Sequence, residues 1–390
     1  MLSLHYSQKL LNLSGILIKD IKNDGHTTTF YIECPRKPHK CPCCGHAISA
    51  IHDYRNQTIK DLPSFGNNTL LVLRKRRYVC TQCGKRFYET TSFLPRYYRH
   101  TTRLALYVLT LLTSTHSFTS VAHVVNLSVS TIIRIFDKPS YAPSELPQVL
   151  SIDEFKGNTG GEKYQCIITD PAHRRVIDIL PNRFKSHLTS YFLSFDTTKT
   201  THFISDMWQN YRDLSNEIFP QATFVVDKYH YIRQVIWAFE AIRKEVQKEF
   251  TDYRRKYFKH SKRLLLKHFD DLNDDQKQQV NTMLYTSIKL ANAYTLKEPF
   301  YTFIASEDYD TAKNLLRNWI QSALASERSR FIECAKTMLN WQQGILNTFK
   351  TPYTNSYTEG INNKIKVLKR NAFGYRNFKR FRNRILHICN

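Results

Sequence analysis

The sequence has few acidic residues, few glycines and no long apolar segment. Its 390 residues include 33 Asp and Glu against 57 Lys and Arg, a formal net charge of +24. Such an excess of base is hard to reconcile with an enzyme for small neutral molecules, and it indicates a polyanionic partner, most simply nucleic acid. A generally basic surface is the alternative, but the basic residues are clustered, as in RKRR at 74–77.

Two further absences narrow the class of protein. No run of about 20 apolar residues occurs, and the N-terminus lacks the basic, apolar and small-residue segments of a signal peptide. We therefore expect a cytoplasmic or nucleoid-associated protein with no membrane partner. Only 11 glycines are present, which favours long helices, and 42% hydrophobic residues suffice for two or three packed domains.

Six of the nine cysteines lie between Cys34 and Cys83, most of them closely spaced. In a reducing compartment this spacing indicates metal ligands rather than disulfides. CPCCG at 41–45 and CTQCG at 80–84 are two C-x-x-C knuckles that each end in Gly, a pattern typical of a structural Zn²⁺ site. The expected ligands are Cys41, Cys44, Cys80 and Cys83. The spacer of 35 residues is long for a zinc ribbon, and three alternative ligands stay open: Cys34, Cys43 and His46.

Residues 117–137 (SFTSVAHVVNLSVSTIIRIFD) contain two short helical patterns, each starting at a Ser and joined by an NLS turn. This layout predicts a helix-turn-helix whose second helix contacts DNA, although another αα-hairpin has a similar pattern. The residues expected to contact DNA from that helix are Ser128, Ser130, Thr131 and Arg134. Two basic clusters are expected to contact phosphates: Arg74, Lys75, Arg76 and Arg77, and in the tail Lys369, Arg376, Lys379, Arg380 and Arg382.

The C-terminal two-thirds begins with short β-branched runs at 149–155, 163–170 and 174–181, which predict an antiparallel meander. Two further strand-like runs, at 201–208 and 222–230, each pass into a helical pattern. The next hundred residues, to about 345, are charged and helical, and the last section is helical again.

Three of these strands end on an acid: Asp153, Asp206 and Asp227. Three strands, a crossover and a fourth strand ending on an acid fit an RNase-H-like sheet, in which acids of the first and fourth strands lie side by side. Cleaving or joining a phosphodiester by in-line attack uses two divalent ions, and hard Mg²⁺ requires oxygen ligands.

Glu359 is the only acid between Thr351 and Asn390, among nine Lys and Arg. If 358–370 is helical, one face carries Glu359, Asn363, Lys366 and Arg370, while Ile361, Ile365 and Leu368 form another face that packs on the sheet. A metal-binding acid followed by phosphate-binding groups suits a helix beside a DNA backbone. A solvated acid at a helix start is the alternative.

These motifs together, from CPCCG and CTQCG through IDEF, ISDMW and VVDKYH to SYTEGINNKIKVLKRNAFGYRNFKRFRNRIL, resemble bacterial insertion-sequence transposases of the DDE type, in the ISL3 group. The resemblance covers nearly the whole chain. It implies a catalytic triad of Asp153, Asp206 and Glu359 that binds two Mg²⁺ (or Mn²⁺), with a helical insertion between the second Asp and the Glu. Asp227 and His230 match a D-x-x-H element with a structural or DNA-positioning role. Asp227 remains the alternative to Asp206 as second acid.

The fold expected is multidomain: a zinc ribbon and helix-turn-helix, then an α/β RNase-H-like core interrupted by the insertion. The expected boundaries are 1–92 for the β-rich lead-in and zinc domain, 93–140 for the helix-turn-helix, 141–148 for a linker, 149–232 and 346–390 for the core, and 233–345 for the insertion. Glu154 should point to the face opposite Asp153, and Asp170 and Asp178 should be turn and strand-face residues.

The resemblance implies a transposase that binds the terminal inverted repeats of its element, cleaves the DNA and joins the freed ends to target double-stranded DNA, as a homodimer or higher oligomer. Trp208 and Trp341 are candidates to stack on a flipped base, with core packing as the expected role. The competing functions are a non-catalytic DNA-binding regulator and an RNase-H-like nuclease without strand transfer.

Overall fold

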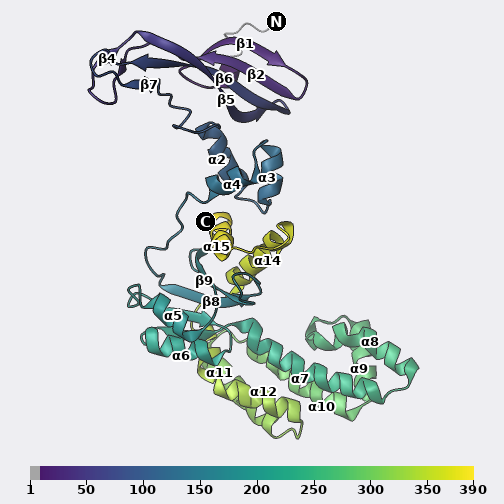
Figure 1. Ribbon diagram of the computed structural model, residues 1–390. Coiled ribbons are helices and arrows are strands. Elements are labelled where there is room, and N and C mark those ends of the chain that lie inside the picture. The colour runs from purple at the N-terminus through teal and green to yellow at the C-terminus, as the bar shows by residue number, and fades with distance from the viewer. Residues whose placement is uncertain (1–8) are drawn as a thin grey trace. The chain divides into compact units, whose positions relative to one another are not determined.

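A computed structural model describes residues 9–390, so the first eight residues of the predicted lead-in lie outside the described residues (Figure 1). The chain forms two compact units. One comprises the residues up to Tyr141 together with Val367–Gly374, and the other comprises Ala142–Lys366 and Tyr375–Asn390. Each unit is described by itself.

The first unit contains a five-stranded sheet in the order β1-β2-β6-β5, with β7 paired to β6. Its strands are β1 (Leu17–Asn23), β2 (Thr27–Glu33), β5 (Ile51–Ser64), β6 (Asn67–Val79) and β7 (Arg86–Tyr88). A separate two-stranded hairpin pairs β3 (His39–Lys40) with β4 (Ala47–Ile48). Alternate side chains of the long strands, such as Ile59, Leu71 and Leu73, are fully buried in the core of this sheet.

Three helices follow: α2 (Thr102–Leu111), α3 (Phe118–Val124) and α4 (Val129–Phe136). The hydroxyls of Ser117 and Ser128 accept hydrogen bonds from backbone N–H groups in the first turns of α3 and α4, as the sequence predicted. The two helices are bent by 111° from one another, the geometry of a helix-turn-helix. No single helix among residues 9–390 is long and apolar enough to cross a membrane. The bent pair α3–α4, taken together, has a length and composition that would suffice.

The second unit is built on a sheet in the order β10-β9-β8-β11-β12. Its strands are β8 (Val149–Phe155), β9 (Gln165–Asp170), β10 (Arg175–Leu180), β11 (His202–Ser205) and β12 (Thr223–Val226). The first three form the predicted antiparallel meander. The last two run parallel to β8 and to each other, and each leads into a helix, as the sequence predicted.

Helices cover both faces of this sheet (Figure 1). On one face, α5 (Lys185–Phe192) and α6 (Gln209–Ile218) enclose a core that includes Leu150, Ile152 and Phe203. On the other face lie α14 (Ser356–Asn371) and α15 (Phe378–Cys389). The sheet is therefore buried on both sides, which leaves its strand ends as the accessible edge.

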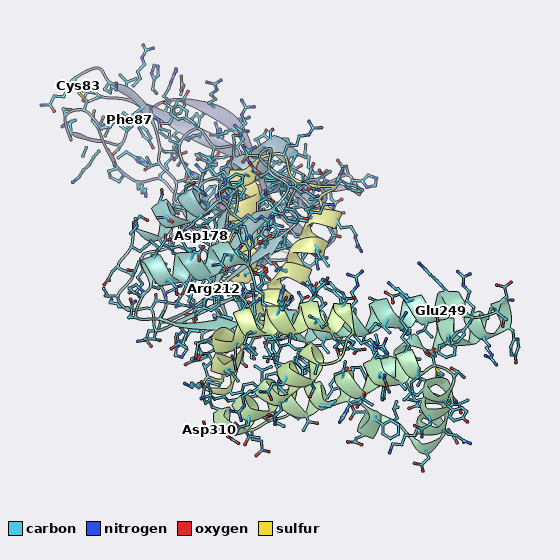
Figure 2. The ribbon with its side chains drawn as sticks, turned by 90° about the horizontal axis from the view of Figure 1, so that it is seen from below. Cys83, Phe87, Asp178, Arg212, Glu249 and Asp310 are labelled. Atoms are coloured by element: carbon cyan, nitrogen blue, oxygen red, sulfur yellow. The ribbon has the colours of Figure 1, made fainter. Side chains whose placement is uncertain are left out.

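The charged helical stretch forms an array of helices with its own core. The elements are α7 (Lys228–Glu249), α8 (Asp252–Leu266), η1 (Phe269–Asp271), α9 (Asp274–Tyr285), α10 (Ile288–Ile304), α11 (Tyr309–Leu324), α12 (Ser329–Asn340), α13 (Gln342–Leu346) and η2 (Asn347–Phe349). Figure 2 labels Glu249 at the far end of α7, away from Arg212 on α6. Helical structure begins at Lys228, directly after β12, and not at about residue 232.

Candidate active site and zinc centre

The two knuckles bring four thiols together. Cys41, Cys44, Cys80 and Cys83 place their sulfur atoms within 4.8 Å of one another. Cys41 Sγ lies 3.6 Å from Cys83 Sγ, and Cys44 Sγ lies 3.5 Å from Cys80 Sγ. A tetrahedral ion with Zn–S bonds of about 2.3 Å requires sulfurs about 3.8 Å apart, so the four side chains fit a structural Zn²⁺.

The long spacer between the knuckles is a hairpin. Strands β5 and β6 pair along their length, with Ile51 opposite Tyr78, so the chain returns to the first knuckle where the second begins. Gly45 and Gly84 follow the knuckles with φ of +73° and +70°, which a Cβ disfavours. The alternative ligands are not in the sulfur group: Cys34 is buried in the core of the sheet, and Cys43 is exposed.

The strand-end acids lie at one edge of the second sheet. In the parallel registers Ile204 lies opposite Ser151, and Ser205 lies opposite Val226. Asp206 and Asp227 directly follow those strands, and Asp153 is two residues beyond Ser151. The carboxyl ends of three adjacent parallel strands therefore carry one acid each, with Asp206 on the central strand β11.

Burial and mutual repulsion raise the pKa of all three acids. Burial, then the Asp227 and Glu154 charges, raise the pKa of Asp153 to about 6. Burial, then the charges of Glu154 and Asp153, raise that of Asp206 to about 7. Burial and the nearby Glu359 charge raise the pKa of Asp227 to about 6. A cluster of acids perturbed in this way is typical of a functional site.

Helix α14 and Asn355, the residue directly before it, contact this sheet through polar side chains. Ser151 Oγ donates a hydrogen bond to Asn355 Oδ1 at 2.6 Å, and the hydroxyls of Thr169 and Thr358 lie 2.7 Å apart. Asn362 Nδ2 donates to Asp153 Oδ2 at 2.9 Å. Neither Asn355 nor Asn362 was predicted from the sequence. Asn362 lies one turn after Glu359, and this i, i+3 spacing was the available signal.

Glu359 lies in the first turn of α14 and is half-buried. Its charge acts on Asp227 across the site. Ile361 and Ile365 are buried, as predicted for the packing face of this helix, and Leu368, which belongs to the first unit, is buried as well. Asn363 and Lys366 are exposed and contact each other, with Lys366 Nζ 3.1 Å from Asn363 Oδ1, and Arg370 is exposed.

Asp227 and His230 form a pair at the start of α7. Asp227 caps the helix by accepting from the Tyr229 backbone N–H, and its Oδ2 lies 3.5 Å from His230 Nε2. Burial and the Arg233 charge lower the pKa of His230 to about 4, so the imidazole is neutral at pH 7. Since Arg233 Nη2 lies 3.3 Å from His230 Nδ1 and can only donate, Nε2 carries the proton and faces Asp227.

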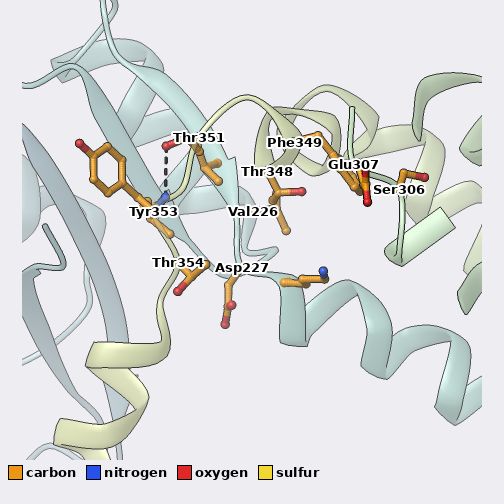
Figure 3. Close-up of a pocket in the computed structure, with 12 residues that line it drawn as sticks. Val226, Asp227, Ser306, Glu307, Thr348, Phe349, Thr351, Tyr353 and Thr354 are labelled. Carbon is orange, nitrogen blue, oxygen red and sulfur yellow. Dashed lines mark hydrogen bonds between the residues drawn. The ribbon is translucent and has the colours of Figure 1, made fainter. Parts of the chain in front are cut away.

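A hollow opens beside Asp227 (Figure 3). It lies between the ends of β11 and β12, the loop before α11 and the segment before α14. Figure 3 shows the Asp227 carboxylate next to Thr354, below Val226. The hollow is lined partly by hydroxyl groups, from Ser306, Thr348 and Thr351 among others. It gives Asp227 an opening to solvent.

Neighbouring acids have other partners. Glu154 pairs with Arg183, whose guanidinium lies over the rings of Tyr164 and Trp208 at 5.0 and 4.7 Å. Asp170, at the end of β9, pairs with His173 and Arg175. Asp178, on β10, accepts from Arg382 Nε at 2.5 Å and from the Tyr191 hydroxyl. These contacts agree with the turn and strand-face roles expected for Asp170 and Asp178.

The basic residues expected to contact DNA differ in accessibility. On α4, Ser128, Ser130 and Arg134 are exposed, Thr131 is half-buried, and Arg134 Nη2 donates to Thr131 Oγ1 at 3.1 Å. In the tail, Arg376 and Lys379 are exposed, while Lys369 and Arg380 are half-buried.

Two of the arginines expected to contact DNA are held in ion pairs. Arg76 is 2% exposed and bound to Glu89, because its position on β6 points into the core between the zinc knuckle and the sheet. Arg382 is engaged by Asp178. On the same strand as Arg76, Arg74 is exposed, Lys75 is half-buried, and Arg77 pairs with Asp53 at the surface.

The strand-end acids suit a hard divalent cation in ligand type. Asp206 Oδ1 is buried and accepts no hydrogen bond, which a bound cation would compensate. Among the side chains that the structure describes, the four cysteines are the group close enough together to hold an ion, and the strand-end carboxylates do not form such a group.

Comparison with known proteins extends over most of the chain. A family model described as a zinc finger of the transposases of IS204, IS1001, IS1096 and IS1165 matches residues 37–83. A model of the helix-turn-helix domain of transposase family ISL3 matches residues 89–138, and the ISL3 transposase model matches residues 150–385, more than half of the chain. The chain belongs to the ISL3 family of transposases. This result confirms the zinc ribbon and the helix-turn-helix domain.

Two of the similar proteins are transposases by name. The chain is 28% identical over 375 residues to the transposase for insertion sequence element IS1001 of Bordetella parapertussis, covering 92% of this chain and 91% of that protein. It is 24% identical over 243 residues to the transposase for IS1557 of Mycobacterium tuberculosis, covering 55% and 54%. A shorter match, 35% identical over 107 residues and 33% of its length, is to a protein named ATP-dependent protease of Lactococcus lactis.

Proposed function

We propose that this ISL3 transposase cleaves DNA at the ends of its element and joins the freed 3′ ends to target DNA, using Asp153, Asp206 and Glu359 as its catalytic acids. The proposal includes an RNase-H-like core in two segments, 149–232 and 346–390, interrupted by the helices of 233–345. The observation that carries it is the placement of Asp206 on the strand next to β8, level with Asp153, with Glu359 on the helix that packs against the same strand ends.

The strand order supports this architecture. β11 is the fourth strand in the chain and lies beside the first, β8. The fifth strand, β12, places Asp227 on the far side of Asp206 from Asp153. We therefore retain Asp206 as the second acid and assign Asp227 to the pair with His230, which orients the start of α7.

The chemistry proposed is in-line displacement at phosphorus. In cleavage, a water oxygen bonds to the phosphorus and the 3′ oxygen leaves; in joining, the 3′ hydroxyl bonds to a target phosphorus and displaces another 3′ oxygen. Asp153, Asp206 and Glu359 would hold two Mg²⁺ ions, which supply activation of the attacking oxygen and stabilisation of the leaving oxygen. Asn362 orients the Asp153 carboxylate, because its amide occupies one carboxylate oxygen.

Sequence recognition is assigned to the first unit. The exposed face of α4, with Ser130 and Arg134, is the surface proposed to enter the major groove at the inverted repeats. Exposed cations such as Arg74 and Lys379 supply phosphate contacts, so binding should weaken steeply as salt rises. Two ends must be processed together, and a homodimer or higher oligomer on DNA is part of the proposal.

The test is a supercoiled plasmid that carries the DNA flanking this gene, incubated with purified protein and Mg²⁺ or Mn²⁺. Wild type is compared with Glu359→Gln, and cleaved and joined products are both measured. Joined products that disappear in Glu359→Gln support the proposal. Cleavage without joining would favour a nuclease. End-specific binding without cleavage in either protein would favour a regulator and make Glu359 an ordinary helix-start acid.

A further inference from the structure

Helix α7 carries two exposed aromatic rings with a cation between them. Tyr229 is 54% exposed and Trp237 is 53% exposed, while other aromatic side chains of this helix, Tyr231 and Phe239, are fully buried. The Arg233 guanidinium lies 5.2 Å from the centre of the Tyr229 ring and 4.5 Å from that of Trp237. Residues four apart share a helix face, so the three side chains form one strip, which spans about 12 Å along the axis.

The strip is joined to the strand-end acids by direct contacts. Arg233 Nη2 lies 3.3 Å from His230 Nδ1, and His230 Nε2 lies 3.5 Å from Asp227 Oδ2. The Tyr229 ring packs edge-on against the His230 ring at 5.8 Å. A strand of DNA whose phosphate is at the acids can therefore continue directly onto α7.

The tryptophans singled out in the sequence are less suited to such contacts. Trp341 is 6% exposed and packs in the helical core, with Arg212 over its ring at 4.3 Å. Trp208 is half-buried, with Arg183 over its ring and Tyr211 packed edge-on at 4.8 Å. Core packing, the role expected for both, agrees with these contacts.

We propose that Tyr229, Arg233 and Trp237 form a binding strip for unpaired DNA bases next to the catalytic acids, an inference that rests on the proposed function. Ring faces stack on bases of any sequence, and a guanidinium between the rings adds a phosphate or cation–π contact. Paired bases are already stacked in a duplex, so the strip selects single-stranded DNA, as arises when the end of an element frays or is cut. Lys244 and Lys248, exposed further along the same face, extend its positive charge.

The experiment measures binding of a fluorescein-labelled 12-nucleotide oligothymidine and of the matched duplex, without added Mg²⁺ or Mn²⁺ and at two salt concentrations. The variants are Trp237→Ala, Tyr229→Ala and Trp237→Phe, with Tyr285→Ala as the control, since Tyr285 is 94% exposed on α9. Each alanine substitution in the strip should weaken single-strand binding about 5- to 150-fold, the range for loss of one base stack. Trp237→Phe and Tyr285→Ala should stay within about twofold of wild type.

The outcomes separate this inference from the proposed function. Because binding is measured without the divalent ions that catalysis requires, loss of single-strand binding in the alanine variants supports the strip even where the wild type fails to cleave plasmid DNA. Equal single-strand binding by wild type and Trp237→Ala overturns it, whatever the cleavage result. Equal losses for single strand and duplex overturn it as well, as does a change of oligomeric state in Trp237→Ala by light scattering, which would make the strip a protein interface.

Discussion

The side-chain amide of Asn362 donates a hydrogen bond to the carboxylate of Asp153, 2.9 Å away and 209 positions earlier in the chain. The contact joins a helix of the C-terminal segment to the first strand of the second sheet. The other oxygen of Asp153, Oδ1, accepts from the Glu154 backbone N–H at 2.7 Å, so both oxygens are held in a fixed direction. Residues that orient a metal-binding carboxylate in this way affect affinity and activity nearly as much as ligands do.

Asn362→Ala should therefore reduce strand transfer by about ten- to a hundredfold and raise the Mg²⁺ concentration required for half-maximal activity. Substitution of an exposed asparagine of α9, Asn281→Ala, is the matched control. The measurement is the Mg²⁺ dependence of joined product from the plasmid assay. A loss of activity with no change in the Mg²⁺ dependence would show that Asn362 only supports the fold.

Asp206 and Asp227 can be separated as candidates for the second acid. Asp206→Asn should reduce cleavage to background, whereas Asp227→Asn should keep measurable cleavage, because Asn is as good a helix cap as Asp. Asp227→Ala should in addition lower the free energy of unfolding by about 0.5–2 kcal/mol, since it removes the cap of α7. Cleavage retained by Asp206→Asn and lost by Asp227→Asn would exchange the two roles.

The zinc ligands can be tested by metal content. Wild type should contain one Zn²⁺ per chain, and Cys80→Ser should lose it together with the thermal stability of the knuckle region. Cys43→Ser should retain the metal, because Cys43 is exposed and outside the sulfur group. Metal analysis of the purified proteins measures the zinc content, and thermal unfolding before and after chelation measures the stability that zinc contributes. Zinc retained by Cys80→Ser would contradict the four-thiolate site.

Substitutions of Arg76 and Arg74 should have different effects on stability, although the two residues lie only two positions apart. Arg76→Ala leaves the carboxylate of Glu89, itself 2% exposed, without its ion pair, so the free energy of unfolding should fall by about 3–5 kcal/mol. Arg74→Ala removes a surface pair with Glu33 and should cost less than about 1 kcal/mol. Urea unfolding measures both values. If both variants lose little stability and Arg76→Ala also binds DNA more weakly, Arg76 contacts DNA and the buried ion pair is not its main role.

His100 should make the stability of the first unit sensitive to acid. Burial lowers its pKa, with the Lys138 and Arg134 charges acting in the same direction. In the unfolded chain its pKa is about 6.5. As pH falls below that value, the unfolded chain binds a proton that the folded chain does not, so stability falls.

Thermal unfolding from pH 8 to pH 5 should therefore show wild type more stable than His100→Gln at pH 8, with the difference narrowing toward pH 5. The exposed His52 provides the control substitution His52→Gln. A difference that stays constant or widens toward pH 5 would show that His100 is not held neutral in the fold.

Local signals in the sequence determined much of this protein. The two C-x-x-C-G motifs indicated all four members of the thiol cluster, because ligand type and spacing are local properties. Ser117 and Ser128 predicted the starts of α3 and α4 for the same reason. The strands before Asp153, Asp206 and Asp227 followed from β-branched runs, and the family was indicated by motifs along nearly the whole chain.

Tertiary structure decided what these local signals could not. The sequence left Cys34, Cys43 and His46 open as ligands, and pairing of β5 with β6 brought Cys80, and not Cys34, to the first knuckle. It made Arg76 a buried ion-pair residue. The RKRR segment alone does not show which of its alternate side chains face the core, because that depends on how the strand pairs in the sheet. It also brought Asn362 to Asp153 and exposed Trp237 rather than Trp341, because contacts between distant segments depend on how helices pack on the sheet and on each other.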